Sequence, residues 1–284
     1  MQSLSDQLTK QSTSKTFNLK ELFKGNFFTI PDYQRGYSWE AQHLADLVKD
    51  IENINENNHK HYTGTIVAAK LNRKANFYEL VDGQQRLTTL VILMNEFYHF
   101  DQVLFEEVKS LFLFRGGIGN EIPVFTPNVE TRSCFNLAIL ERKSFQPTIK
   151  SHQSILDASR FFKEWLLLNK DNVVGLYQTI LNQLSFLFFT HEHDKEIGIM
   201  FEVINNRGKE LSELEKIKNF FIYYATVHDK QKLRDDINTL WVSIQTNLSQ
   251  SQRTSNDDEK AFLRYCYLVF FKTTKEKSWN VYDE

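Results

Sequence analysis

The spacing of apolar residues divides the chain into a part that mixes strands with helices and a part that is mainly helical. Before residue 120 the pattern predicts helices over 19–24, 39–57 and 84–98 and strands over 27–30, 62–71 and 77–81, with a hairpin turn at 72–76. After it, the pattern predicts a strand over 184–190 and helices over 128–142, 151–169, 172–183, 195–205, 213–228, 230–248 and 257–274. The sequence therefore predicts an α+β fold, with a disordered tail over 1–14, a mixed α/β domain over 15–120 and a helical domain over 121–284.

Composition indicates a folded globular protein and limits how the chain can contact DNA. Hydrophobic residues make up 41% of the 284 residues and include 24 Phe, which is sufficient for a large core. The net charge is −2, whereas a protein that coats DNA by charge alone is strongly basic, so any DNA contact must be a local patch. Two cysteines without metal-ligand spacing, no secretion signal and no apolar stretch long enough for a bilayer predict a cytoplasmic protein that does not enter a membrane.

The string VDGQQRLTT at residues 81–89, the DGQQR segment, places a glycine turn between a predicted strand and a predicted helix. Gly83 allows the backbone to approach a ligand, and the N–H groups at the start of a helix favour a phosphate. Arg86 offers a planar fork of donors to the same phosphate, and Asp82 is a candidate to hold Mg²⁺ or orient water. Gln84 and Gln85 are candidates to position that water or to contact a base edge.

An alternative interpretation of the DGQQR segment needs no ligand. Asp-Gly turns are common, and the same residues can form a plain turn capped by glutamine. The residue types are equally compatible with both interpretations. The segment is not a phosphate-binding P-loop, because the pattern GxxxxGK[ST] occurs nowhere in the chain.

The string IPDYQRGYSW at residues 30–39, the aromatic loop, crowds large rings and polar groups between a predicted strand and a helix that Ser38 should cap. Rings stack on bases and guanidinium groups contact phosphates. The residues expected on a DNA surface are Tyr33, Gln34, Arg35, Tyr37 and Trp39. The alternative, which the residue types favour, is that the rings pack onto the core while Arg35 pairs with a carboxylate.

The string FEVINNRGKELSELEKIK at residues 201–218, the late segment, combines helix signals with a polar turn. Ser212 and Glu215 predict a capping box for the helix that follows. Helical spacing predicts that Leu214, Ile217 and Phe221 face the core. Helix formation does not require the polar turn Asn205-Asn206-Arg207, which is therefore a candidate to face a ligand.

Together the three strings resemble the N-terminal domain of GmrSD-type restriction enzymes, the family that includes the SspE proteins. The marks of that family are an IPxYQRxYxW string, a DGQQR string followed by LTTL, and a later F-x-x-IN-x-RG-x-x-L string that opens a helix. All three occur here in that order, from about residue 28 to residue 218. Three strings in order form a specific match, which one alone would not give.

The resemblance implies a core related to those of ParB and sulfiredoxin, followed by a helical bundle. It implies binding and hydrolysis of a nucleoside triphosphate (GTP, UTP or ATP) with Mg²⁺, in phage defence against DNA that carries either phosphorothioate in its backbone or glucosylated bases. It assigns catalysis to Asp82, Gln84, Gln85 and Arg86, with Asp82 also on the metal. The residues expected to bind nucleotide are Gly83, Thr88, Arg35, Asn205 and Arg207.

The chain also departs from the family pattern. Glu215 stands where the family often has Asp, and there is no cysteine at 82–86 for the thiol chemistry of sulfiredoxin. No HxxP string occurs, and no histidine follows His228. We therefore expect the HNH-type nuclease partner on a separate subunit or on another part of a longer protein. The sequence is also compatible with a homo-oligomer of this chain.

Two further functions stay open beside a nucleoside triphosphatase. In the first, the nucleotide is a conformational ligand that is hydrolysed slowly or not at all, because glutamine is a poorer base than a carboxylate or histidine. In the second, the chain is a scaffold that only positions a nuclease.

Overall fold

The computed structural model describes residues 13–57, 59–71, 76–117, 119–191, 230–253 and 255–272, together with 212, 214, 215, 217, 218, 221, 222, 225 and 274. Six strands form one mixed sheet in the order β1–β8–β3–β4–β2–β7. These strands are β1 (Thr13–Asn18), β2 (Phe27–Thr29), β3 (His61–Lys70), β4 (Phe77–Asp82), β7 (Phe125–Thr126) and β8 (Leu184–His191). The expected α+β fold is confirmed, while the expected likeness to ParB and sulfiredoxin stays a prediction.

Strand pairing in the sheet confirms the predicted hairpin and adds long-range partners. β3 and β4 pair antiparallel, with Ala68 opposite Leu80 and Lys70 opposite Tyr78. β8 lies parallel to β3 and antiparallel to β1, while β2 lies parallel to both β4 and β7. A separate two-stranded sheet pairs β5 (Phe114–Arg115) with β6 (Ile122–Pro123). Strands from both sides of the division expected near residue 120 thus lie in one sheet.

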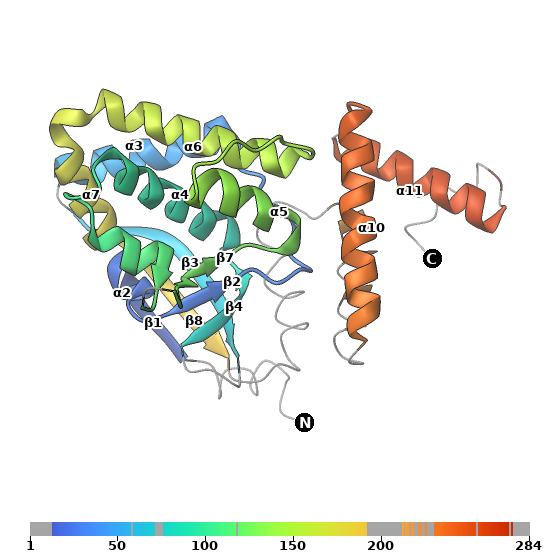
Figure 1. Cartoon of the computed structure of the whole chain (residues 1–284), viewed down its shortest axis with the longest axis horizontal. Coiled ribbons are helices and arrows are strands. Elements are labelled where there is room, and N and C mark those ends of the chain that lie inside the picture. Colours follow the sequence, from blue (N-terminus) through green and yellow to red (C-terminus); the bar gives the residue numbers. More distant parts are fainter. Residues whose placement is uncertain are drawn as a thin grey trace.

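Helices cover one face of the large sheet (Figure 1). The described helices are α2 (Leu19–Phe23), α3 (Ala41–Asn57), α4 (Gln84–Phe100), α5 (Val129–Cys134), α6 (Lys150–Leu168), α7 (Val173–Asn182), α10 (Gln231–Gln250) and α11 (Asn256–Phe271). The last two lie beside the body and do not belong to the layer on the sheet. Short π-helical segments η1 (Lys109–Leu113) and η2 (Phe135–Leu140) and a 3₁₀ turn η3 (Lys170–Asn172) complete the described elements. Among the helices that the structure describes, none combines the length and the apolar composition needed to cross a membrane.

Strand residues alternate between the two faces of the sheet, as the pleat requires. Ile66, Ala68 and Leu80 belong to the main core with the helices, whereas Val67, Ala69 and Val81 form a separate small cluster. α4 lies at the centre of the main core, and every residue from Leu87 to Phe97 is buried. A helix that is buried on all sides is held by packing. The DGQQR segment therefore lies at the start of the helix that occupies the centre of the core.

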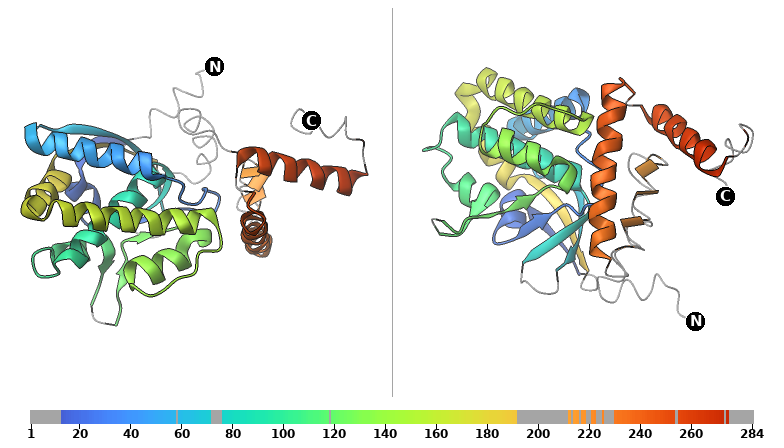
Figure 2. Two further views of the ribbon diagram at one scale, coloured as in Figure 1. Left: turned by 90° about the horizontal axis from the view of Figure 1, so that it is seen from above. Right: turned by 45° about the vertical axis from the view of Figure 1, so that its right-hand side comes forward.

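The C-terminal helices have a hydrophobic cluster of their own. Figures 1 and 2 show α10 beside the end of the body that carries α5, with α11 pointing away. This cluster consists of Leu214, Trp241 and Leu248, with Ile244, Phe262 and Leu263 packed against it. It is distinct from the main core under the sheet.

The late segment confirms one prediction and corrects another. Ser212 and Glu215 form the predicted capping box, because the Ser212 N–H donates to Glu215 Oε2 at 2.8 Å and the Glu215 N–H donates to Ser212 Oγ at 3.2 Å. Leu214 is buried as predicted, but Ile217 is 37% exposed and Phe221 is 49% exposed. The prediction that Ile217 and Phe221 face the core was wrong. The helix buries the side chain of the neighbouring Lys218 instead.

Candidate functional site

Gly83 forms the predicted glycine turn at the start of α4. It is the N-cap residue, with φ 91° and ψ 5° in the left-handed region that favours glycine. A Cβ atom here would lie 2.4 Å from Ile66 Cδ1 and 3.2 Å from the Thr65 carbonyl oxygen. The turn therefore requires glycine both for its backbone conformation and for its contact with β3.

The two glutamines after this turn are buried, and their amide groups bind the aromatic loop. Gln85 accepts a hydrogen bond from the Ser38 N–H at 2.8 Å and donates from Nε2 to the Gly36 carbonyl at 3.0 Å. Gln84 donates from Nε2 to Gln34 Oε1 at 2.9 Å. These contacts give both glutamines a structural role, which is to hold the aromatic loop and not to cap the turn as the alternative interpretation expected.

The aromatic loop is consequently fixed against the start of α4. Gln34 is 1% exposed and donates from Nε2 to the Val81 carbonyl at 2.7 Å. Tyr37 is 4% exposed, and its hydroxyl lies 2.7 Å from Thr89 Oγ1. Burial raises the pKa of Tyr37 above its ordinary value. Both side chains were expected on DNA, but in this fold they are internal.

The remaining residues of the aromatic loop keep some exposure. Tyr33, Arg35 and Trp39 are each partly buried, and the Trp39 ring stacks on His43 with centroids 5.9 Å apart. Ser38 does not cap α3 as expected, because the helix begins later, at Ala41, and the Ser38 N–H binds Gln85. Of the five residues expected on DNA, these three keep some exposure, although the Tyr33 hydroxyl is buried and the Trp39 ring packs against the main core.

Thr88 does not fit the nucleotide contact expected of it. Its side chain is 3% exposed, and its hydroxyl donates to the Gln84 carbonyl at 2.7 Å. Such a bond back to the preceding turn is common for threonine inside a helix. Asn205 and Arg207, the other late candidates for nucleotide binding, lie outside the described residues.

Asp82 and Arg86 are the part of the DGQQR segment that stays partly exposed. Arg86 donates from Nη1 to the Thr65 carbonyl at 3.1 Å, and its guanidinium lies against Gly64, where a Cβ would be 2.7 Å from Cζ. Burial lowers the pKa of Arg86, while the nearby charges of Asp82 and Tyr62 act in the opposite direction. The pair therefore combines a partly desolvated cation with a carboxylate at the edge of the turn.

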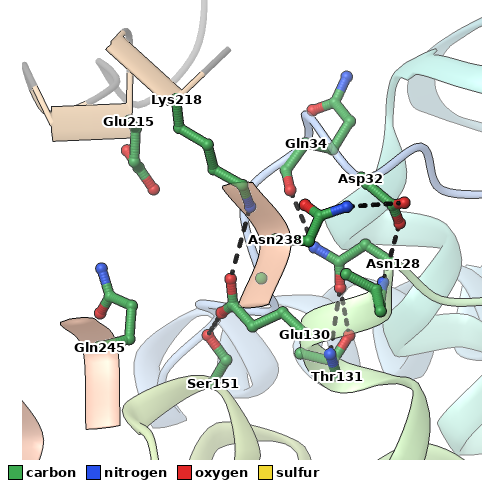
Figure 3. Close-up of polar contacts among 12 residues, drawn as sticks. Asp32, Gln34, Asn128, Glu130, Thr131, Ser151, Glu215, Lys218, Asn238 and Gln245 are labelled. Carbon is green, nitrogen blue, oxygen red and sulfur yellow. Dashed lines mark hydrogen bonds and ion pairs between the residues drawn. The ribbon is translucent and has the colours of Figure 1, made fainter. Parts of the chain in front are cut away.

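A second polar network lies on the other side of the aromatic loop (Figure 3). Asp32 accepts from the Val129 N–H at 3.1 Å and from Asn238 Nδ2 of α10 at 3.1 Å. Asn128 caps α5 and donates from Nδ2 to the Gln34 carbonyl at 2.8 Å. The loop is thus bonded to α4 on one side and to α5 and α10 on the other.

Glu130 and Lys218 form a buried ion pair within this network. Lys218 Nζ lies 3.8 Å from Glu130 Oε2, and the side chains are only 3% and 6% exposed. The other carboxylate oxygen of Glu130 accepts from Ser151 Oγ at 3.1 Å. Burial lowers the pKa of Lys218, and the charges of Glu130, Asp32 and Glu215 oppose that effect. Burial also raises the pKa of Glu215.

Sequence reasoning missed Asn128, Glu130, Lys218 and Asn238. The Pro-Asn pair at 127–128 is a recognisable helix-start signal, so Asn128 could have been assigned as a cap. Glu130 and Lys218 are 88 positions apart in the chain, and no local pattern encodes their contact.

His152, which contacts the Glu130 backbone, is expected to make stability depend on pH. Its Nε2 lies 2.9 Å from the Glu130 carbonyl oxygen, and burial lowers its pKa. A histidine with a lowered folded-state pKa contributes stability that is complete above its unfolded-state pKa, about 6.5, and is lost as the pH falls below that value.

We therefore expect the free energy of unfolding to fall between about pH 7 and about pH 5.5, and to fall less in His152→Gln. Urea denaturation of both proteins at the two pH values measures the difference. An identical pH dependence in the two proteins would contradict the assignment to His152.

A family model described as GmrSD restriction endonuclease, N-terminal domain, matches residues 19–222, which include all three strings. The match identifies the chain as a component of a restriction or defence system. The chain belongs to the family of GmrSD N-terminal domains. No curated protein matches the chain with significance.

Proposed function

We propose that this chain is the nucleotide-responsive, DNA-sensing module of a restriction system that attacks modified DNA together with an HNH-type nuclease. The observation that carries the proposal is the placement of the DGQQR segment and the late segment on two sides of the aromatic loop. The DGQQR segment binds one side of this loop, and residues of the late segment lie against Glu130 on its other side. A ligand bound on either side of the aromatic loop would therefore contact a loop that is held by the segments on both sides.

Nucleotide binding is assigned to Arg86 and Asp82, the partly exposed residues at the glycine turn. A guanidinium offers paired donors to a phosphate, and Mg²⁺ is commonly held by one or two carboxylates together with phosphate oxygens and water. Among the described residues, no three side chains of the metal-binding types are grouped together. Asp82 would therefore hold the metal only jointly with the phosphates.

The geometry favours nucleotide as a conformational ligand over rapid hydrolysis. Gln85 is bonded to the loop through both atoms of its amide and Gln84 through its Nε2, so these donors and the Gln85 oxygen are already committed to the fold. Hydrolysis is the second candidate function, and Asp82 is the group at the turn that would orient the attacking water in that case.

DNA contact is assigned to Tyr33, Arg35 and Trp39. Each is partly exposed on the aromatic loop, and the combination suits stacking on bases and pairing with a phosphate. The other two residues expected on DNA, Gln34 and Tyr37, are not assigned this role, because their polar groups are bonded inside the fold.

The Arg86→Ala protein provides the direct test of nucleotide binding. Calorimetric titration with GTP, UTP and ATP in the presence of Mg²⁺ should detect binding of at least one of them to the wild-type chain. Losing a hydrogen bond from a charged group costs about 1.5–3 kcal/mol, so we expect Arg86→Ala to weaken binding by at least about tenfold. Arg160→Ala, which removes an exposed guanidinium from α6, is the matched control and should bind as the wild type does.

Phosphate release under multiple-turnover conditions separates the two candidate functions. The proposal predicts little release of phosphate, with or without DNA that carries either phosphorothioate in its backbone or glucosylated bases. Sustained release that Arg86→Ala abolishes would favour the hydrolytic function. Failure of all three nucleotides to bind would remove both candidates and leave a scaffold.

A further inference from the structure

Two polar contacts dock the C-terminal helices onto the body. Asn238 of α10 donates to Asp32 Oδ2 at 3.1 Å, and Lys218 lies 3.8 Å from Glu130 Oε2 (Figure 3). We call these four residues the polar latch. Asp32 belongs to the aromatic loop and Glu130 to α5, so the latch joins the loop and its support to the C-terminal helices.

Three of the four latch residues, Glu130, Lys218 and Asn238, are buried although they are charged or amide groups, while the Asp32 side chain is 23% exposed. Lys218 and Asn238 are 3% and 7% exposed, and Asn238 Oδ1 has no hydrogen-bond partner within the part of the chain that the structure describes. Burying polar groups without full hydrogen bonding is costly. The latch therefore holds the C-terminal helices on the body less tightly than a hydrophobic interface of the same size would.

The C-terminal helices can keep their own structure when this contact opens. Leu214, Trp241 and Leu248 form a cluster that is separate from the main core. Polar interfaces between parts of one chain resemble transient protein interfaces, and relative motion across them is the usual expectation.

The body side of the latch is connected to the DGQQR segment through Gln34 and Asn128. Gln34 accepts from Gln84, and its backbone carbonyl accepts from Asn128, the cap of the helix that carries Glu130. A short chain of hydrogen bonds thus runs from the start of α4 to the latch. Rearrangement at the glycine turn would change the geometry of the residues on which the C-terminal helices dock.

We infer that the polar latch is releasable, and that a ligand at residues 82–86 shifts the equilibrium between docked and undocked C-terminal helices. The identity of that ligand rests on the proposed function, whereas the latch itself does not. This gives the sensing module an output: the position of α10 and α11 relative to the body.

Distances between spin labels on the full chain test the latch. The labels are placed at Lys163→Cys on α6 and Lys232→Cys on α10, two exposed sites, with Cys266→Ser to remove the exposed native thiol. A second pair, at Lys49→Cys on α3 and Lys163→Cys, reports on the body alone. Pulsed electron resonance then gives the docked and undocked populations.

Removing one partner of the ion pair leaves the other charge buried alone. We expect Lys218→Met to lower the ratio of docked to undocked molecules by at least about tenfold, and Glu130→Gln/Lys218→Met to recover most of that loss. Lys109→Met is the control, because it breaks the exposed Lys109–Glu121 pair (3.1 Å) and should change nothing. The α3–α6 distance should stay constant in every variant.

Two results would overturn the latch. One is a wild-type α6–α10 distance distribution in Lys218→Met, and the other is broadening of the α3–α6 distance, which would make the pair part of the general core. The coupling is tested by adding GTP, UTP or ATP with Mg²⁺: the docked ratio should shift in the wild type and stay fixed in Arg86→Ala. If nucleotide binds but the docked ratio does not shift, the coupling alone is overturned. If no nucleotide binds, the proposed function is overturned, and the result of the Lys218 variants on the latch still stands.

Discussion

Replacing Gln85 by alanine is expected to lower the free energy of unfolding by about 2–6 kcal/mol. Gln85 is 8% exposed and bonds two backbone groups of the aromatic loop, the Ser38 N–H and the Gly36 carbonyl. Alanine would leave both of these groups without their partner in a region from which water is largely excluded. Each such loss costs about 1–3 kcal/mol, so the total is large for a single polar residue. Urea denaturation of the two proteins measures it.

Two companion variants make the Gln85 result specific. Gln85→Glu keeps an oxygen that can accept from Ser38 but loses the donor to Gly36 and adds a buried charge, so it should not restore stability. Gln42→Ala, which removes an exposed glutamine from α3, should have little effect. If Gln85→Ala abolished nucleotide turnover while the free energy of unfolding stayed unchanged, Gln85 would be a catalytic residue and not a structural one.

Gly36→Ala is expected to be the second large change, with a cost of about 1–3 kcal/mol from overpacking. A Cβ at this position would lie 2.3 Å from Ser151 Oγ, 2.4 Å from Glu130 Oε1 and 2.8 Å from Ser151 Cβ. Side-chain ends often move aside at little cost, but Glu130 is already held by Ser151 and Lys218. The loop or the ion pair must therefore shift.

A compensating change tests the cause of the Gly36 effect. Ser151→Gly removes two of the three atoms in conflict, so Gly36→Ala/Ser151→Gly should be more stable than the sum of the two single effects predicts. Neighbouring residues that share a contact normally show such non-additivity. Thermal or urea unfolding of the four proteins gives the coupling energy, and strict additivity would exclude this steric explanation.

Local patterns in the sequence predicted the elements that surround the site. The glycine turn at Gly83, the α4 helix after it and the β3–β4 hairpin follow from short-range rules, and the structure contains all three. The capping box of Ser212 and Glu215 was equally visible, because its two residues are three positions apart. Short-range signals of this kind depend on backbone geometry and side-chain reach, which the sequence specifies directly.

The roles of the polar residues were not predictable in the same way. Gln84, Gln85 and Tyr37 have residue types that suit a ligand site, but their partners lie 47 to 52 positions away in the chain. Whether such a side chain faces a ligand or the fold depends on tertiary packing, which no local pattern contains. The burial of Lys218 in place of Ile217 has the same origin, since Glu130 is contributed by another part of the chain.

A string of polar residues at a glycine turn therefore has two separable parts in this protein. Gln84 and Gln85 fix the aromatic loop, whereas Asp82 and Arg86 remain at the edge of the turn. Substituting the whole string would remove the support of the loop and the proposed ligand site together. Substituting single members separates the stability of the loop from the binding of a ligand.

Hydrogen exchange at the Ser38 amide is the most direct test of this division. The account predicts that the Ser38 N–H, which donates to Gln85 Oε1 at 2.8 Å, is strongly protected in the wild type and exchanges rapidly in Gln85→Ala. Rapid exchange in the wild type, or equal protection in the two proteins, would contradict the claim that Gln85 holds the aromatic loop.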